Sequence, residues 1–221
     1  MTSQGMANSG PKPVPKPLFL VGECWGENES RISRPFVGHS GLELLRILSD
    51  AGQLELTSID RQYISDFYRL GNPQAVASIW ALHRDEFYLT NVFNIHPPAN
   101  RLEWFCGPKD SRIAGYPPLL PSKYVQAGYQ SELDRLGDEI LAVDPNLIVA
   151  LGNTALWALC GRTGVSKLRG TTTLTTHLVS GFKLMPVYHP SAVLRQWELR
   201  PTTVIDLAKA GRAKEGFGTS Q

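Results

Sequence analysis

Four short runs of the chain are rich in apolar residues and predict strands. They are Leu18–Val21, Phe87–Phe93, Leu147–Leu151 and Lys183–Tyr188. The first and third runs are apolar throughout, which is typical of strands that helices cover on both faces of a sheet. Pro186 lies inside the fourth run. Because proline has no backbone N–H, we expect an edge strand or an irregular strand at this position.

Between these runs, apolar residues recur every three or four positions, which is the spacing of an amphipathic helix. The pattern is clearest in Tyr129–Val143, where Leu133, Leu136 and Ile140 share one face. Helices are also predicted at Gly41–Ala51, Asn153–Leu159 and Thr202–Ala213. Strands that alternate with helices predict an α/β domain with a mainly parallel sheet.

The two ends of the chain differ from its middle. Prolines alternate with Lys and Val from Pro11 to Pro17, and such a segment can join neither a helix nor a central strand. We therefore expect residues 1–17 to form a disordered tail. Residues 211–221 are rich in glycine and polar residues, and we expect a flexible C-terminal tail there. A single domain is predicted over residues 18–210.

Composition narrows the class of protein. The 22 Lys and Arg residues nearly balance the 20 Asp and Glu residues, for a net charge of +2, so any binding of nucleic acid must depend on a local patch. No apolar run is long enough to span a membrane, and residues 1–10 lack the apolar core of a signal peptide. The three cysteines lie far apart, which argues against a disulfide framework. We expect a cytoplasmic protein.

The chain's unusual polar segments follow the predicted strands. In parallel α/β sheets, ligands bind beyond the carboxyl ends of the strands, so these segments are the place to look for a site. They are Gly22–Glu29 with Arg34–Gly41, Thr90–Arg101, Leu147–Ala155, Lys167–Gly170 and Tyr188–Arg195.

In this order, the five segments resemble the uracil-DNA glycosylase superfamily, and most closely its family 4 enzymes and their phage-type relatives. The resemblance runs from about Leu18 to Ala210. It implies a three-layer α/β/α fold around a mainly parallel, four-stranded sheet. It also implies an enzyme that binds DNA, flips uracil out of the stack, hydrolyses the N-glycosidic bond and leaves an abasic site. We expect a monomer, with a replication or repair protein as a further partner.

The resemblance implies three catalytic residues. The acidic residues of the first loop are Glu23 and Glu29. Glu23 would position or activate the attacking water, or offset charge on the sugar. Glu29 is a second acid of the same loop, and bracing of the loop is the alternative role for it. His189 would donate a hydrogen bond to O2 of the base as negative charge develops there.

Four further residues are implied to bind the base. Phe36 would stack on it, and Asn91 would read the polar edge of the pyrimidine, because a carboxamide both donates and accepts hydrogen bonds. The backbone at Cys24 would add contacts, and Trp25 would lie beside the base. No partner base for a Cys24 nucleophile is visible in the sequence. Taken singly, each of these residue types more often has a structural role.

Contacts to DNA are assigned to the loops that flank the same strand ends. Leu194 and Arg195 belong to the loop that would enter the groove beside the flipped nucleotide, and other residues would contact the phosphates. The expected DNA-binding residues are Lys167, Arg169, Ser191, Leu194 and Arg195.

Two departures from family 4 change the expectations. Family 4 enzymes carry four cysteines that bind a four-iron cluster, and this chain lacks that set, so we expect no iron–sulfur cluster, no metal site and no cofactor. Trp25 stands where family 4 has proline, and its indole could stack on DNA, reshape the pocket or fill it. Two alternatives therefore stay open: a glycosylase for another damaged or modified base, and a catalytically inactive member that binds DNA or protein.

Overall fold

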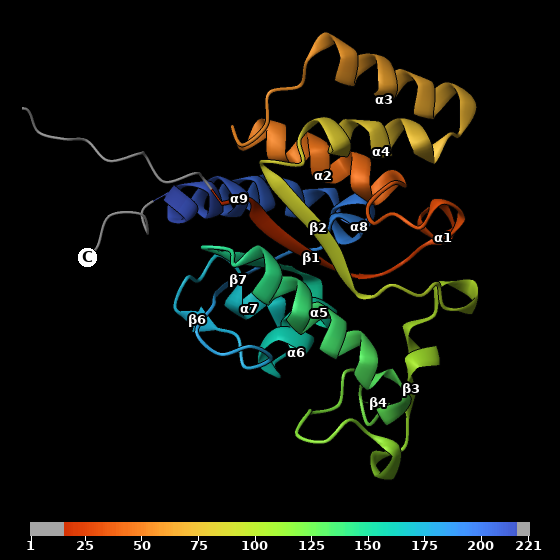
Figure 1. Cartoon of the computed structure of the whole chain (residues 1–221), viewed down its shortest axis with the longest axis vertical. Helices are drawn as coiled ribbons and strands as arrows, with labels where there is room; N and C mark the ends of the chain where they lie inside the picture. Colours follow the sequence, from red (N-terminus) through yellow and green to blue (C-terminus); the bar gives the residue numbers. More distant parts are fainter. Residues whose placement is uncertain (1–15, 216–221) are drawn as a thin grey trace, which may run out of the picture.

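A five-stranded sheet in the order β2-β1-β5-β7-β6 lies at the centre of the structure (Figure 1). The computed structural model describes residues 16–215. The sheet strands are β1 (Leu18–Cys24), β2 (Phe87–Phe93), β5 (Ile148–Leu151), β6 (Leu174–Thr175) and β7 (Lys183–Val187). The four predicted strands are parallel to one another, and the short β6 adds an antiparallel edge.

Pro186 fits into β7 because its outer side has no neighbouring strand. β6 pairs only with Lys183 and Leu184 of β7. The carbonyl of Pro186 points away from β5 and accepts the N–H of Gly170 at 2.9 Å. Since the nitrogen of a strand residue lies on the same side as its carbonyl, no ladder hydrogen bond is lost. β7 is therefore an edge strand, as predicted at Pro186, only along its second half.

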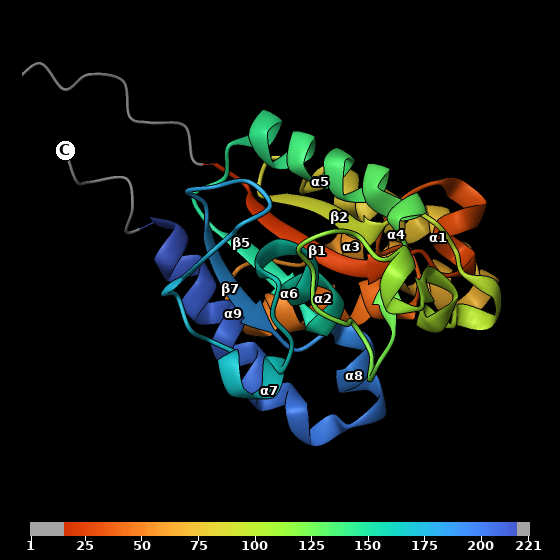
Figure 2. The same ribbon diagram turned by 90° about the horizontal axis from the view of Figure 1, so that it is seen from below.

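Helices cover both faces of the sheet and make the three-layer α/β/α fold (Figures 1 and 2). Side chains of β1 alternate between two cores, with Leu18 and Leu20 in one and Phe19 and Val21 in the other. One face carries α2 (His39–Asp50), α3 (Ser58–Leu70), α4 (Pro73–Leu82), α8 (Pro190–Arg195) and α9 (Arg200–Glu215). The other face carries α5 (Gln130–Val143), α6 (Gly152–Cys160) and α7 (Val165–Leu168).

The pair α3 and α4 was not among the predicted helices, although its boundaries carry clear sequence signals. Thr57 and Asp60 form a capping box at the start of α3, and Gly71 ends that helix in the left-handed conformation. The Asn72 side chain then caps α4, whose first residue is Pro73. These are standard start and stop signals.

Two other segments refine the predicted organisation. The excursion after β2 contains a two-stranded sheet of β3 (Cys106–Gly107) and β4 (Tyr124–Val125). Helix α9 continues to Glu215, so its end includes residues that the sequence analysis placed in the C-terminal tail. Residues 1–15 and 216–221, which hold the remainder of both predicted tails, lie outside the described part of the chain. No helix within residues 16–215 is both long and apolar enough to cross a membrane.

Candidate active site

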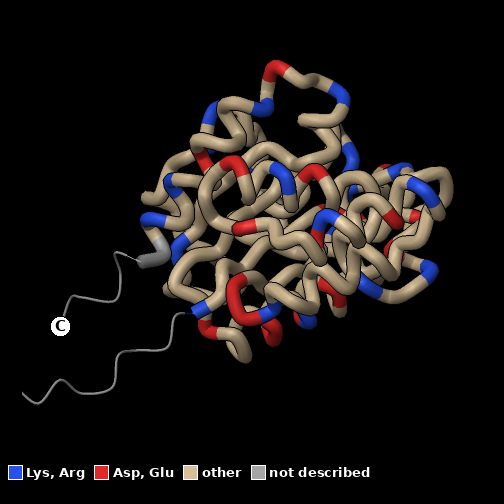
Figure 3. Tube along the Cα trace, turned by 90° about the horizontal axis from the view of Figure 1, so that it is seen from above, with Lys and Arg blue, Asp and Glu red and all other residues tan. Residues whose placement is uncertain are grey.

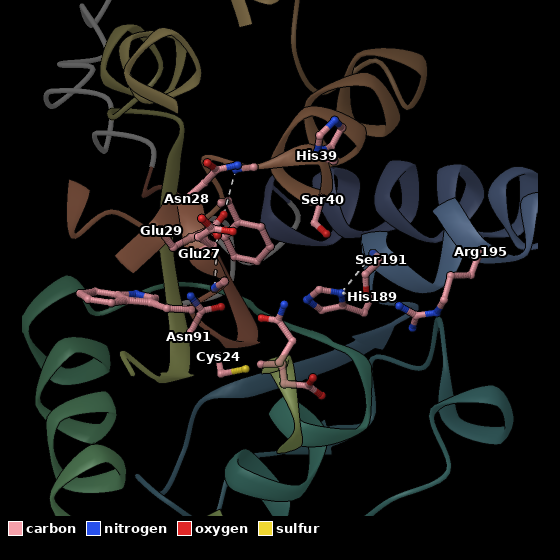
Figure 4. A pocket seen from close by; sticks show the side chains of 16 residues that line it. Cys24, Glu27, Asn28, Glu29, His39, Ser40, Asn91, His189, Ser191 and Arg195 are labelled. Carbon is pink, nitrogen blue, oxygen red and sulfur yellow. Dashed lines mark hydrogen bonds between the residues drawn. The ribbon is translucent and has the colours of Figure 1, made fainter. Parts of the chain in front are cut away.

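A cavity of about 400 Å³ opens at the carboxyl ends of β1, β2 and β7. Its walls come from the loop after β1, the helix α1 (Glu27–Ile32), the first turn of α2, the end of β2 and the start of α8. Figure 4 shows His189 and Ser191 on one side of this space and Asn91 and Cys24 on the other. The predicted site residues that line it are Glu23, Cys24, Trp25, Glu29, Phe36, Asn91, His189, Ser191 and Arg195.

Phe36 is held in an unusual backbone conformation. Its φ angle is +55°, which is rare for a bulky residue and persists only where the surroundings over-determine it. The indole N–H of Trp80 donates to the Phe36 carbonyl at 2.9 Å. A side chain at Gly41 would overlap that same carbonyl. The Phe36 ring is thereby fixed at the cavity, 6.1 Å from the His189 ring centre to centre.

Asn91 presents a carboxamide with unused hydrogen-bonding capacity. It pairs with Gly22 in the β1–β2 ladder, and a Cβ at Gly22 would overlap its Oδ1 atom. Arg135 donates to the Asn91 carbonyl at 2.8 Å and so holds the end of the strand. Asn91 is only 3% exposed, yet within residues 16–215 no hydrogen bond to its carboxamide is formed. These polar groups are thus available to a ligand.

His189 follows β7 and is the N-cap residue of α8. The backbone N–H of Ser191 donates to its Nδ1 at 3.1 Å, and the Ser191 hydroxyl lies 2.8 Å from the same atom. Because Nδ1 accepts, the proton of the neutral ring resides on Nε2. Burial lowers the pKa of His189 below 6.5, Glu23 opposes this shift, and Arg195 adds to it. Figure 4 shows the other ring nitrogen facing away from Ser191, toward the side where Asn91 lies.

Glu23 is oriented by a residue that sequence reasoning did not assign. The hydroxyl of Thr154, in the first turn of α6, donates to the Glu23 carboxylate. Thr154 is 1% exposed, so its hydroxyl is shielded from solvent. Thr154 lies in the strand-end segment Leu147–Ala155, and this position is the sequence feature that could have identified it. One oxygen of Glu23 is thereby committed to the protein, and the carboxylate lines the cavity.

Glu29 braces two loops. Its Oε1 accepts the N–H groups of Val37 and Gly38 at 2.9 and 2.8 Å, and its Oε2 accepts the N–H of Gly26 at 3.2 Å. The loop after β1 is therefore tied to the segment that carries Phe36. With both oxygens committed in this way, the geometry favours the bracing role over the catalytic role.

Cys24 and Trp25 follow Glu23 in the same loop. Burial raises the pKa of the Cys24 thiol to about 12, with Glu23 and Glu29 adding to the effect, so the group is a neutral thiol and a poor nucleophile. The indole N–H of Trp25 is enclosed without a hydrogen-bond partner in the described chain. Trp25 lines the cavity but leaves it open at about 400 Å³, which argues against the plugged pocket.

The expected DNA-binding residues divide into two groups. Ser191 and Arg195 line the cavity, and Leu194, 45% exposed, lies beside them on α8. Lys167 is exposed on α7 but lies outside the cavity. Arg169, also outside the cavity lining, has a partner within the protein: its guanidinium donates to Asp206 at 2.8 and 3.1 Å. This ion pair holds the segment after α7 against α9, so the DNA contact predicted for Arg169 stays a prediction.

Within residues 16–215, basic residues do not gather on the face that Figure 3 shows. Figure 3 shows Lys and Arg spread along the trace and interspersed with Asp and Glu. Around the cavity, the charged residues are Glu23, Glu27, Glu29 and Arg195. The interior is thus suited to offset positive charge, while Arg195 supplies the cation at its margin.

A four-cysteine iron–sulfur cluster does not fit this chain. Its three cysteines are Cys24 on β1, Cys106 on β3 and Cys160 on α6, and all three are free thiols. Within residues 16–215, no group of three or more His, Cys, Asp or Glu side chains could hold a metal ion.

Other polar residues of the cavity wall were not singled out by sequence reasoning. They belong to the strand-end segments described above. Their position in these segments, and no motif of their own, could have identified them in the sequence. They are Glu27, Asn28, His39, Ser40 and Asn100. Of these, Asn100 is held by His96, whose Nε2 lies 3.1 Å from its Oδ1.

One family model and several relatives match this chain. The model of the family described as "Uracil DNA glycosylase superfamily" matches residues 11–209. A type-4 uracil-DNA glycosylase of Thermotoga maritima is 27% identical, covering 87% of this chain and 75% of that protein. One from Sulfurisphaera tokodaii is 26% identical, covering 87% and 67%. A DNA polymerase of Bacillus phage SP01 is 30% identical over 60% of this chain and 12% of its own length.

Proposed function

The chain belongs to the uracil DNA glycosylase superfamily, and we propose that it removes uracil from DNA by hydrolysing the N-glycosidic bond. The products would be free uracil and an abasic site. The observation that carries this proposal is the convergence of Glu23, Phe36, Asn91 and His189 on one cavity. These side chains come from four separate segments of the chain, and each has a part in the reaction.

The cavity can hold a base that has left the duplex. The Phe36 ring offers an aromatic face on which the base can stack. The unpartnered carboxamide of Asn91 can accept from N3–H of uracil and donate to its O4. Gly22 is required at this point because any side chain there would overlap both residues.

His189 supports departure of the base. When the bond between C1′ and N1 breaks, its electron pair moves onto the base and raises the negative charge on O2. The neutral ring carries its proton on Nε2, and this N–H can donate to O2 in the transition state. The Ser191 N–H keeps the ring in the tautomer that this role requires.

Glu23 has the complementary task on the sugar. Positive charge develops at C1′ while the bond breaks, and a carboxylate nearby stabilises it. Water then adds its oxygen to C1′ and loses a proton, for which the Glu23 carboxylate is the acceptor of choice in the cavity wall. Thr154 fixes the orientation of that carboxylate. We propose this chemistry without a metal or cofactor.

A cleavage assay tests the proposal directly. The full chain is incubated with end-labelled oligonucleotides that carry one uracil, single-stranded or paired with A or G, and alkali converts abasic sites into strand breaks. We expect breaks at the uracil and none in the matched thymine oligonucleotide. An Asn91→Asp variant should lose selectivity for uracil, because a carboxylate cannot donate to O4. Absence of breaks at stoichiometric protein would refute the proposal.

Trp25 favours one second candidate, a glycosylase for a modified base. Its indole replaces the family proline, lines the cavity and carries a buried N–H without a partner in the described chain. The same assay with a panel of modified pyrimidines and hypoxanthine separates the two candidates: faster cleavage of a panel member than of uracil would favour the second.

A further inference from the structure

The indole of Trp197 is exposed to solvent, two residues along the chain from Arg195, which lines the active-site cavity. Trp197 follows α8 in a short 3-10 turn, Trp197–Leu199, and is 61% exposed. Large apolar side chains at this exposure forgo the free energy of burial. A singly exposed side chain needs no explanation by itself, but the surroundings of Trp197 set it apart.

The indole rests on a rigid base. The guanidinium of Arg200 lies 5.0 Å from the centre of the Trp197 ring, within the range of a cation–π contact. Arg200 is itself anchored by Glu43 at 2.8 Å and by Asp50 at 2.6 Å. Glu43, a residue of α2, is 1% exposed, so Arg200 is anchored to a buried carboxylate. One face of the ring is therefore supported from the protein side.

The supported ring is continuous with the proposed DNA-binding loop. Residues 194–198 are all exposed, and Arg195 within this stretch lines the cavity. Leu194 is 45% exposed and carries the predicted groove contact. Trp197 thus lies two residues from the cavity wall. Glu198 is the acidic residue of this stretch and would repel a phosphate backbone. The positive charge of Arg195 offsets this repulsion.

We propose that Trp197 is a stacking platform for an unpaired base of the DNA strand that holds the extruded nucleotide. This rests on the proposed function. Every base offers an aromatic face, and stacking on an exposed aromatic side chain is the usual way in which proteins hold single-stranded nucleic acid without reading its sequence. Because Arg200 already orders the indole, little conformational entropy is lost when a base stacks on it.

Binding of uracil-free DNA tests the platform separately from catalysis. Fluorescence anisotropy with a labelled single-stranded oligo-dT measures the dissociation constant for the full chain and its variants. We expect Trp197→Ala to weaken binding about five- to a hundredfold and Trp197→Phe to retain most of the affinity. The control is Leu82→Ala, which removes a 58% exposed side chain at the end of α4 and should leave binding unchanged.

A second readout covers failure of the alanine variant to fold. Stacking on DNA should quench the fluorescence of Trp197, so the parent should lose emission on titration with oligo-dT and Trp197→Phe should lose distinctly less. Equal affinity of Trp197→Ala and parent, or equal quenching in parent and Trp197→Phe, would overturn the platform. A protein that binds through Trp197 but releases no uracil would refute the proposed function and leave the platform standing.

Discussion

Nδ1 of His189 accepts the backbone N–H of Ser191 at 3.1 Å, and this contact sets which nitrogen of the ring faces the cavity with a proton. The first prediction follows from it. His189→Ala removes the donor to the departing base and should slow single-turnover cleavage of a uracil oligonucleotide about a hundred- to a thousandfold. Binding of the same oligonucleotide should change little. A variant as fast as the parent would contradict the role of the residue.

The lowered pKa of His189 predicts a dependence of stability on pH. Its folded pKa lies below the unfolded value of 6.5, so between the two the unfolded chain binds more protons than the folded chain. As pH falls through this window, the free energy of unfolding should fall, and the loss should stop below the folded pKa. The measurement is urea unfolding from about pH 7.5 to about pH 5.

The matched control for that series is His189→Gln, which has no ring to titrate. Other ionisable groups are common to both proteins, so the difference in unfolding free energy between them isolates His189. We expect the parent to lose more stability than the variant as the solution is acidified. Parallel curves would show that His189 titrates as an ordinary exposed histidine does.

Glu29 and Glu23 should respond differently to the same change. Glu29→Gln replaces one acceptor oxygen by an NH₂ group that faces backbone donors, so we expect a loss of about 1–3 kcal/mol of unfolding free energy together with a loss of activity. Glu23→Gln should leave stability nearly unchanged and slow cleavage at saturating DNA. Denaturant unfolding and single-turnover rates on both variants make the comparison. A stable but inactive Glu29→Gln would assign chemistry to Glu29.

Gly22 should tolerate no side chain. A Cβ at this position would overlap Oδ1 of Asn91 and the ring of Phe36, so Gly22→Ala should displace both base contacts and slow cleavage on the order of a hundredfold. The matched control is Gly128→Ala, where a Cβ meets no atom within 4 Å. Cleavage by Gly22→Ala at the parental rate would show that the base does not occupy this part of the cavity.

Arg169 and Arg195 should separate stability from DNA binding. Arg169→Gln leaves Asp206, which is 4% exposed, without its cation and should cost about 1–3 kcal/mol of unfolding free energy. Arg195→Gln should instead weaken DNA binding and lower the salt slope of the binding constant by about one. Anisotropy titrations at several salt concentrations test both variants. An unchanged salt slope for Arg195→Gln would remove it from the phosphate contacts.

Much of the fold followed from local pattern. The apolar runs located the four parallel strands because strands buried on both faces need continuous hydrophobicity. The stripe of α5 was equally readable, since an amphipathic helix repeats every 3.6 residues. The helices α3 and α4 were missed despite their capping signals, and β6 was missed because two residues carry no period at all.

The residues of the candidate site were likewise only partly predictable from the sequence. The resemblance to the superfamily nominated Glu23, Phe36, Asn91 and His189, and they meet in the fold because parallel strands bring their carboxyl ends to one edge of the sheet. Residue type could not tell Glu23 from Glu29, or Arg169 from Arg195, since each pair shares the same chemistry.

Only the tertiary structure gives the members of each pair different partners. Glu29 meets three backbone N–H groups from two loops, and Arg169 meets Asp206 of α9, contacts between segments that no local pattern records. Thr154 and the Arg200 support of Trp197 arise in the same way. Sequence alone determined the four parallel strands and the loops that gather at their ends, because hydrophobic periodicity is a local property. The task of each polar side chain depends on partners that only folding brings within hydrogen-bonding distance.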